Sequence, residues 1–466
     1  MSREAVVVGA GPNGLVGAIT LARAGWKVRV LEAADEPGGG VRTEELTLPG
    51  FAHDVCSAVH PMALASTALA DLKVDWVQPD APLAHPLDGG RAVVVERSVD
   101  ATAAHLGEDG PAYQSLMTRI VAGASSITDA VLSPRRVPRP SVALVDYGRV
   151  GIRSATSLAR SKFETPDAQA LMGGLAAHSV LPLDSPLTAG VGLLLGLLAH
   201  AVGWPLARGG SQTIADALVA ELEAAGGEVQ TGVRVRALDE LGSPDAVMLD
   251  LTPAQVLAVV GNQLPKRYRR ALTRYRYGPG VCKVDWALDG PIPWSAPEVG
   301  RAVTVHVGGT LEEIAAAEAD PHAGRHAARP FVLLAQATVA DPTRAPAGKH
   351  TGWAYCHVPS GSTEDRSDAI EAQVERFAPG FRDRILARNV LTAKAIEARD
   401  PSRVGGDIGG GVADWRQLLA RPTVSERPWV TPVRGLYLCS SATPPGGGVH
   451  GMCGWHAARA VLRRHR

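Results

Sequence analysis

Three glycines near the N-terminus have the spacing of a phosphate-binding turn. Gly9, Gly11 and Gly14 follow the short apolar run 5–8 and precede a stretch with helical apolar spacing. In such a β-α-β unit the first glycine permits a tight turn, the second lets the backbone approach a pyrophosphate, and the third lets the helix pack on the strand. Glu32 ends the next apolar run, where its carboxylate would accept hydrogen bonds from ribose hydroxyls. The pattern predicts a dinucleotide site.

A second glycine loop indicates which dinucleotide binds. Residues 36–43, EPGGGVRT, place Gly38, Gly39 and Gly40 just after the ribose-binding position and add Arg42. A nicotinamide dinucleotide does not need this loop. An extended FAD does, because its pyrophosphate and ribityl chain cross a second glycine loop, where an arginine can neutralise phosphate charge. The sequence therefore predicts FAD as the cofactor.

These motifs are part of a longer resemblance. The chain resembles the phytoene-dehydrogenase-like FAD oxidoreductases in the two glycine loops and in four further stretches: PGFAHDVCSAVHP (49–61), WPLARGGSQTIADAL (204–218), VGGDIGGGVADWRQLLARP (404–422) and GLYLCSSATPPGGGVHGMCG (435–454). This group lies within the amine-oxidase and glutathione-reductase class of flavoproteins. The nearest branch is the one called pyridine nucleotide-disulfide oxidoreductase domain-containing protein 2. The similar stretches span nearly the whole chain.

The resemblance implies that the C-terminus closes the flavin site. It implies a strand at 436–439, then a glycine loop, then a helix from about Gly448. The N–H groups at 449–452 would face the ring edge that gains negative charge on reduction. The class often has an acidic residue just after this strand, and here Ser440 and Ser441 stand in its place. A hydroxyl can make the same hydrogen bond without a charge.

The motifs and the resemblance together give a set of cofactor-binding residues. The resemblance assigns an adenine contact to the main chain of Val233. The predicted set is Gly9, Gly11, Pro12, Asn13, Gly14, Glu32, Ala33, Gly39, Gly40, Arg42, Val233, Ser441, Gly448, Val449, Gly451 and Met452. No attachment motif is present, so we expect FAD to be bound non-covalently.

The predicted fold class is α/β, with a Rossmann-like FAD-binding domain and a second α+β substrate domain built on an antiparallel sheet. Strand-like runs such as 281–288 and 352–357 indicate that second sheet. We expect the FAD-binding domain to be discontinuous. It comprises residues 1–75, 205–260 and 420–466, and the substrate domain comprises residues 76–204 and 261–419.

The sequence shows no recognisable catalytic motif. It has no C-x-x-C pair, so disulfide reduction is not expected, and no second G-x-G-x-x-G for NAD(P)H. Hydride transfer to a flavin needs a positioned C–H or N–H bond more than it needs an acid–base residue. Three polar residues are candidates for a part in the chemistry: His60, Asp407 and His450. The helix dipole would keep His450 neutral, and a structural role is the alternative for each of the three.

Charge and cysteine content exclude other classes of protein. The 466 residues carry 47 basic and 47 acidic side chains, so no basic excess points to nucleic acid. The cysteines show no metal-ligand spacing, so no metal is expected, and their odd number fits a reducing cytoplasm. The first apolar run begins at Ala5, so we expect no signal peptide and a cytoplasmic protein.

Residues 187–204, LTAGVGLLLGLLAHAVGW, form the most apolar run of the chain. A buried helix of the substrate domain is the favoured interpretation. A lining for an apolar substrate channel and a weak peripheral membrane contact are the alternatives, and a homodimer is also left open.

The leading functional hypothesis is an FAD-dependent oxidoreductase that oxidises or desaturates an apolar small molecule, with dioxygen or a quinone as acceptor. The alternatives are a flavin amine oxidase, a redox-neutral flavin isomerase, and a flavin-stabilised regulatory or interaction protein with little turnover. The few tyrosines give no clear aromatic pair, which an amine oxidase would need.

Overall fold

The apolar runs of the N-terminal motif form the centre of a five-stranded parallel sheet in the computed structural model, which describes residues 3–133 and 141–465. The strand order is β16-β10-β1-β2-β9. These strands are β1 (Glu4–Val8), β2 (Lys27–Leu31), β9 (Glu228–Gln230), β10 (Ala246–Leu249) and β16 (Leu436–Leu438). Alternate residues of β1 face opposite sides: Val7 enters one apolar core and Val8 the other.

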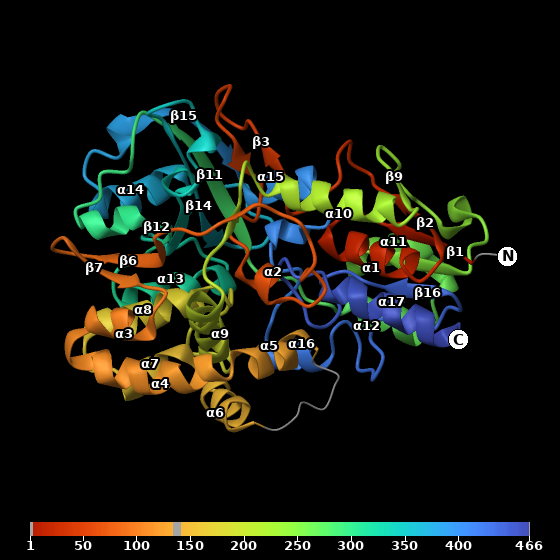
Figure 1. The fold of residues 1–466 in the computed structure, drawn as a ribbon, viewed down its shortest axis with the longest axis horizontal. Coiled ribbons are helices and arrows are strands. Elements are labelled where there is room, and N and C mark those ends of the chain that lie inside the picture. Colours follow the sequence, from red (N-terminus) through yellow and green to blue (C-terminus); the bar gives the residue numbers. More distant parts are fainter. Residues whose placement is uncertain (1–2, 134–140, 466) are drawn as a thin grey trace.

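Helices cover both faces of this sheet, which gives the predicted Rossmann-like arrangement. One face is covered by α1 (Pro12–Ala22), α10 (Gln212–Ala224) and α17 (Met452–Arg464), and the other by α11 (Pro253–Val260) and α12 (Lys266–Thr273). Figure 1 shows both chain termini in this lobe. Leu272 of α12 packs into the core of this first lobe. The lobe therefore extends beyond the predicted domain boundary at residue 260.

The second lobe is built on a seven-stranded sheet with the order β15-β11-β14-β13-β12-β6-β7. Its strands are β6 (Ala81–Leu87), β7 (Arg91–Val95), β11 (Gly280–Leu288), β12 (Ala302–Val307), β13 (Val332–Ala335), β14 (His350–Val358) and β15 (Ile385–Leu391). Every pair of neighbours is antiparallel except β12 with β6, which is parallel. The predicted antiparallel sheet is therefore mixed at one position, since β6 joins it from an earlier part of the chain.

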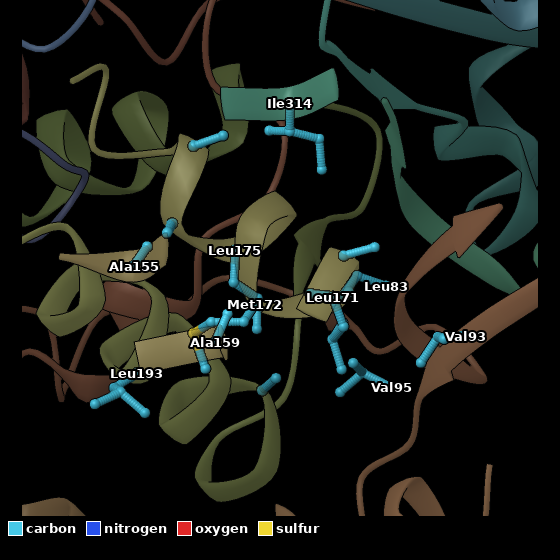
Figure 2. Packing of buried hydrophobic residues seen from close by; sticks show 14 of the residues in the cluster. Leu83, Val93, Val95, Ala155, Ala159, Leu171, Met172, Leu175, Leu193 and Ile314 are labelled. Atoms are coloured by element: carbon cyan, nitrogen blue, oxygen red, sulfur yellow. The ribbon is translucent and has the colours of Figure 1, made fainter. Parts of the chain in front are cut away.

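One face of the second sheet packs against a layer of helices. The helices of this layer are α3 (Val99–Ala104), α4 (Gly110–Ala122), α5 (Ala124–Leu132), α6 (Val142–Gly151), α7 (Ala155–Lys162), α8 (Pro166–Ala177), α9 (Thr188–Ala201) and α13 (Leu311–Ala319). Helix α14 (Ser367–Phe377) packs against the opposite face. Figure 2 shows Leu83 and Val95 of the sheet beside Leu171 and Leu175 of α8. Burying such side chains is worth about 1.5–3 kcal/mol each.

The most apolar run of the sequence is helix α9, and most of its residues are buried in this helical layer. Among the described residues no helix is long and apolar enough to cross a membrane. The favoured interpretation of this run, a buried helix, agrees with its position.

The remaining elements are short and lie between the lobes or at their edges. They are β3 (Thr43–Glu44) paired with β4 (His53–Asp54), β5 (Trp76–Val77) paired with β8 (Leu206–Ala207), α2 (Pro61–Ala65), α15 (Ala393–Arg399) and α16 (Trp415–Leu419).

Candidate cofactor and active site

A cavity of about 670 Å³ extends from the glycine motif of the first sheet to the face of the second sheet. At one end it is lined by Glu32 and Val233, at the carboxyl edge of the parallel strands. At the other end it is lined by Leu333 and Trp353 of the second sheet. Carboxyl edges of parallel strands are where open α/β sheets bind their ligands.

The N-terminal glycines have the geometry that the spacing predicts. Gly9 has φ +102°, which favours glycine, and a Cβ on Gly14 would lie 2.1 Å from the carbonyl oxygen of Gly9. Gly14 therefore lets α1 pack against the turn and does not itself line the cavity. Glu32 accepts hydrogen bonds from the N–H groups of Ala10 at 2.7 Å and Ala34 at 2.9 Å, which fix its carboxylate in the cavity wall.

Most of the predicted cofactor residues meet in this one cavity. Those in its wall are Gly9, Gly11, Pro12, Asn13, Glu32, Ala33, Gly39, Gly40, Val233, Ser441, Gly448 and Val449. The four outside it are Gly14, Arg42, Gly451 and Met452. The N–H of Val233 already donates to the carbonyl oxygen of Glu32 at 2.8 Å, so it is not free to contact an adenine.

Arg42 does not line this cavity, and its predicted contact with a phosphate stays a prediction. Its Nε donates to the carbonyl oxygen of Gly39 at 3.2 Å, and its side chain lines a small adjoining space. A different guanidinium, that of Arg403 from the segment after α15, lies in the cavity wall over Gly40. A Cβ on Gly40 would lie 2.3 Å from Nη2 of Arg403. A side chain at position 40 would therefore force this guanidinium to shift.

The C-terminal glycine loop lies against protein as well as the cavity. Helix α17 begins at Met452, and not at about Gly448, because Gly448 (φ +117°) and Gly451 (φ +67°) have left-handed backbone conformations. A Cβ on Gly447 would lie 2.5 Å from the carbonyl oxygen of Gly409. Ser440 lines the cavity, and its hydroxyl donates to the carbonyl oxygen of Leu251 at 2.7 Å.

The three residues proposed from the sequence for the chemistry have structural partners and do not line the cavity. His60 contacts the hydroxyl of Ser211 at 3.1 Å. His450 accepts from the N–H of Met452 at 3.0 Å, and burial lowers its pKa to about 4, so it is neutral as expected. The carboxylate of Asp407 accepts from three backbone N–H groups, those of Gly278, Gly409 and Gly411, at 2.7–2.8 Å. Each of the three holds backbone or a neighbouring loop in place.

Comparison with known proteins shows which proteins this chain is similar to. An NAD(P)-binding Rossmann-like domain model matches residues 7–71. The rat pyridine nucleotide-disulfide oxidoreductase domain-containing protein 2 is 27% identical, over 99% of this chain and 93% of its own. The phytoene desaturase (neurosporene-forming) of Rhodobacter capsulatus is 24% identical, over 97% and 92%. The chain is thus similar, over nearly its whole length, to proteins named as FAD-type oxidoreductases of the kind that the sequence resembles.

The fold comparison agrees with that relationship. The structure of a putrescine oxidase variant superposes on this FAD oxidoreductase with a TM-score of 0.63 and 18% identity, over 100% of this chain and 99% of the other, which shows a shared fold. The predicted fold class, the enzyme class and the FAD cofactor are confirmed at the level of the family. The assignment of individual cofactor and catalytic residues stays a prediction.

The residues of the cavity fit an FAD. Oδ1 of Asn13, at the start of α1, is buried without a hydrogen-bond partner among the described residues. The first N–H groups of a helix also lack partners within it. Glu32 offers a carboxylate at one side of this turn, and Arg403 offers a cation beyond it. These groups have the chemistry that the ribose and phosphates of an FAD would need.

The far end of the cavity was not foreseen from the sequence. It is lined by Leu333 and Ala335 of β13 and by Trp353 and Tyr355 of β14. The two rings stack with centroids 5.8 Å apart and planes inclined by 15°. His178, just after α8, also lies in this wall. The signal available in the sequence was the alternation of residues 353 and 355 along one strand, which puts both rings on one face.

His178 is the end of a line of three histidines. Its Nε2 lies 2.9 Å from Nε2 of His306, and the rings of His306 and His85 have centroids 6.4 Å apart. Burial and the nearby His357 lower the pKa of His178 to about 4. His178 is therefore neutral at pH 7, with one ring nitrogen bonded to His306.

Proposed function

We propose that this FAD oxidoreductase oxidises or desaturates an apolar small molecule by hydride transfer to FAD, with dioxygen or a quinone as the final acceptor. The observation that carries the proposal is the composition of the cavity wall at the second sheet. Leu333, Ala335 and Trp353 are buried there and give it an apolar, aromatic surface. Such a wall binds a hydrocarbon by removing its surface from water, at about 25 cal/mol per Å² of apolar area.

His178 is suited to take the proton that a desaturation releases. Removing two hydrogens from neighbouring carbons sends one away as a hydride and the other as a proton, and bound FAD supplies the hydride acceptor. In the tautomer in which His178 donates from Nε2 to His306, its Nδ1 carries a lone pair. Because burial keeps His178 neutral, that lone pair is available to accept the proton.

The test is anaerobic bleaching of the flavin absorbance by a panel that contains a cyclic terpene, a linear polyene and a primary amine. We expect bleaching with a hydrocarbon. The variant His178→Gln keeps a polar side chain but not a base, and we expect it to retain FAD and to bleach about 10²-fold more slowly. Bleaching by the amine alone would overturn the proposed substrate class. A full rate in His178→Gln would remove that residue from the chemistry.

A second candidate function, amine oxidation, is favoured by one observation. The stacked pair of Trp353 and Tyr355 is an aromatic surface of the kind that binds amines, and the sequence had not revealed it. The putrescine oxidase variant with the same fold acts on an amine by its name. The amine in the panel separates the two candidates.

The other expectations about the setting of this protein remain predictions. The five cysteines are free thiols, which fits the expected reducing cytoplasm. A peripheral membrane contact would be seen as sedimentation with liposomes, and a homodimer as a doubled mass in solution.

A further inference from the structure

Asp250, the residue after β10, lies directly against the phosphate-binding turn. Its Oδ2 accepts a hydrogen bond from the N–H of Gly14 at 2.9 Å. A Cβ on Gly11 would lie 2.9 Å from that same oxygen, and a Cβ on Gly9 would lie 2.9 Å from the carbonyl oxygen of Asp250. The carboxyl group therefore touches the turn that the resemblance and the spacing assign to the cofactor pyrophosphate.

The second carboxyl oxygen of Asp250 is open to the cavity. Asp250 is part of the cavity wall, and among the described residues Oδ1 has no hydrogen-bond partner. An ionised carboxylate at this place would face the two negative phosphates of a dinucleotide, which is unfavourable. A protonated carboxyl would instead present an O–H donor to them.

The charges around Asp250 favour the protonated form. Glu32 at the end of β2 and Asp400 after α15 face it with negative charge, and Arg403 faces it with positive charge. Behind it lie the buried thiols of Cys439 and Cys453, whose pKa values are raised by burial, so they are neutral. Burial, opposed by the hydrogen bond from Gly14 and reinforced by Glu32, raises the pKa of Asp250 to about 7 even before a phosphate is present.

We propose that Asp250 is a cofactor-binding residue that holds the FAD pyrophosphate as a neutral carboxylic acid, donating from Oδ1 while Oδ2 accepts from Gly14, so that FAD binds together with a proton. This proposal rests on FAD as the cofactor and adds a residue and a proton to its site. The proton that Asp250 holds comes from solvent when FAD binds and returns to solvent when FAD leaves.

The sign of the pH dependence follows from this linkage. Phosphate charge raises the pKa of Asp250 further in the complex, so the complex holds a proton that the free protein releases above pH 7. FAD affinity is then greatest below pH 7 and falls as the pH rises, by up to about tenfold per pH unit. A binding site without such a group has a flat profile in this range.

The experiment measures FAD release from the holoprotein and rebinding to the released protein, by FAD fluorescence, between pH 6 and 9. We compare wild type with Asp250→Asn, whose amide oxygen can accept from Gly14 and whose NH₂ donates at every pH. The control is Glu32→Gln, which removes a carboxylate of the same cavity that is held by Ala10 and Ala34. Circular dichroism of each released protein verifies that it is folded.

We expect the dissociation constant of wild type to rise about tenfold between pH 7.5 and 8.5 and that of Asp250→Asn to stay constant, with the variant the tighter binder at pH 8.5. Glu32→Gln should bind more weakly at every pH and still lose affinity as the pH rises, with the onset at lower pH because Glu32 helps to raise the pKa of Asp250. Equal slopes in wild type and Asp250→Asn would overturn the proposal, as would a variant that binds more weakly at pH 6. Failure of all three proteins to bind FAD at any pH would overturn the cofactor assignment as well.

Discussion

Arg344 offers the sharpest test of what holds the two lobes together. Its guanidinium is fully buried and donates to Asp341 of the same turn at 2.9 Å, to Asp54 of β4 at 3.0 Å, and to the carbonyl oxygen of Ala207 at 3.1 Å. Asp54 in turn accepts from the N–H of Ser211 at 2.8 Å. The cluster ties the segment after the second glycine loop to the second lobe.

Replacing Arg344 by methionine keeps most of the volume and removes the charge. Removing one partner of a buried ion pair costs about 3–5 kcal/mol, and here two buried carboxylates lose their counter-ion, so we expect the upper end of that range. This is a large part of the 5–15 kcal/mol that stabilises a typical domain. Arg208→Met is the matched control, since Arg208 pairs with Asp75 at 2.6 Å and both side chains are about half exposed or more. Its loss should cost about 0–1 kcal/mol.

The assay is urea denaturation followed by circular dichroism, repeated from pH 7 down to pH 3. Burial alone would raise the pKa of Asp54, but Arg344 and the hydrogen bonds from Ser211 more than offset it and hold that pKa below its usual value. The stability from this pairing is therefore complete above pH 4 and is lost as the pH falls through the lowered value.

Two results would refute this reasoning. The difference in unfolding free energy between wild type and Arg344→Met should become smaller below pH 4, where Asp54 becomes protonated and no longer pairs with Arg344. A difference that does not change with pH would show that the ion pair does not cause the loss of stability. The triple variant Arg344→Met, Asp54→Asn, Asp341→Asn should recover part of the lost stability, because no carboxylate is then left unpaired. A loss no larger than that of Arg208→Met would show that the cluster does not join the lobes.

Two further substitutions test the glycine and aspartate assignments. Gly40→Ala should weaken FAD binding, because its Cβ would lie 2.3 Å from Nη2 of Arg403 and push the cation away, whereas Gly300→Ala, with open space around its Cβ, should leave the dissociation constant of FAD unchanged; equal effects would mean that Arg403 does not contact the cofactor. Asp407→Ala removes the acceptor of three backbone N–H groups, so we expect the free energy of unfolding to fall by about 1–3 kcal/mol and the melting temperature to fall with it. The rate of flavin bleaching per bound FAD should not change. A selective loss of that rate would show that Asp407 takes part in the chemistry.

The parts of the site that the sequence predicted are those set by local geometry. Gly9, Gly14 and Glu32 lie on one continuous β-α-β unit, so their spacing alone fixes where they meet. Arg42 was the exception, since a short loop let its side chain turn back to the carbonyl oxygen of Gly39. A residue on a loop can point to either side, and spacing does not decide which.

The parts that the sequence did not predict come together only through the tertiary fold. Arg403 and Gly40 are far apart in the chain, as are His178 and Trp353, yet each pair shares the cavity wall. No periodicity links such residues. Asp250 had a local signal, an acidic residue at the end of a buried strand, but its meaning depends on the turn packed against it. Loop partners and cavity walls therefore needed the structure.

The glycines of residues 405–411 and 446–448 are needed because these two loops lie against each other, and not only because of a cofactor. A Cβ on Gly447 would lie 2.5 Å from the carbonyl oxygen of Gly409, and a Cβ on Gly410 would lie 2.2 Å from the hydroxyl of Ser441. One loop follows α15 and the other precedes α17 of the first lobe. Two motifs that look like separate cofactor loops thus form one contact between the lobes beside the cavity. A side chain at Gly447 would push against the backbone of Gly409, so we expect it to change the contact between the two loops beside the cavity.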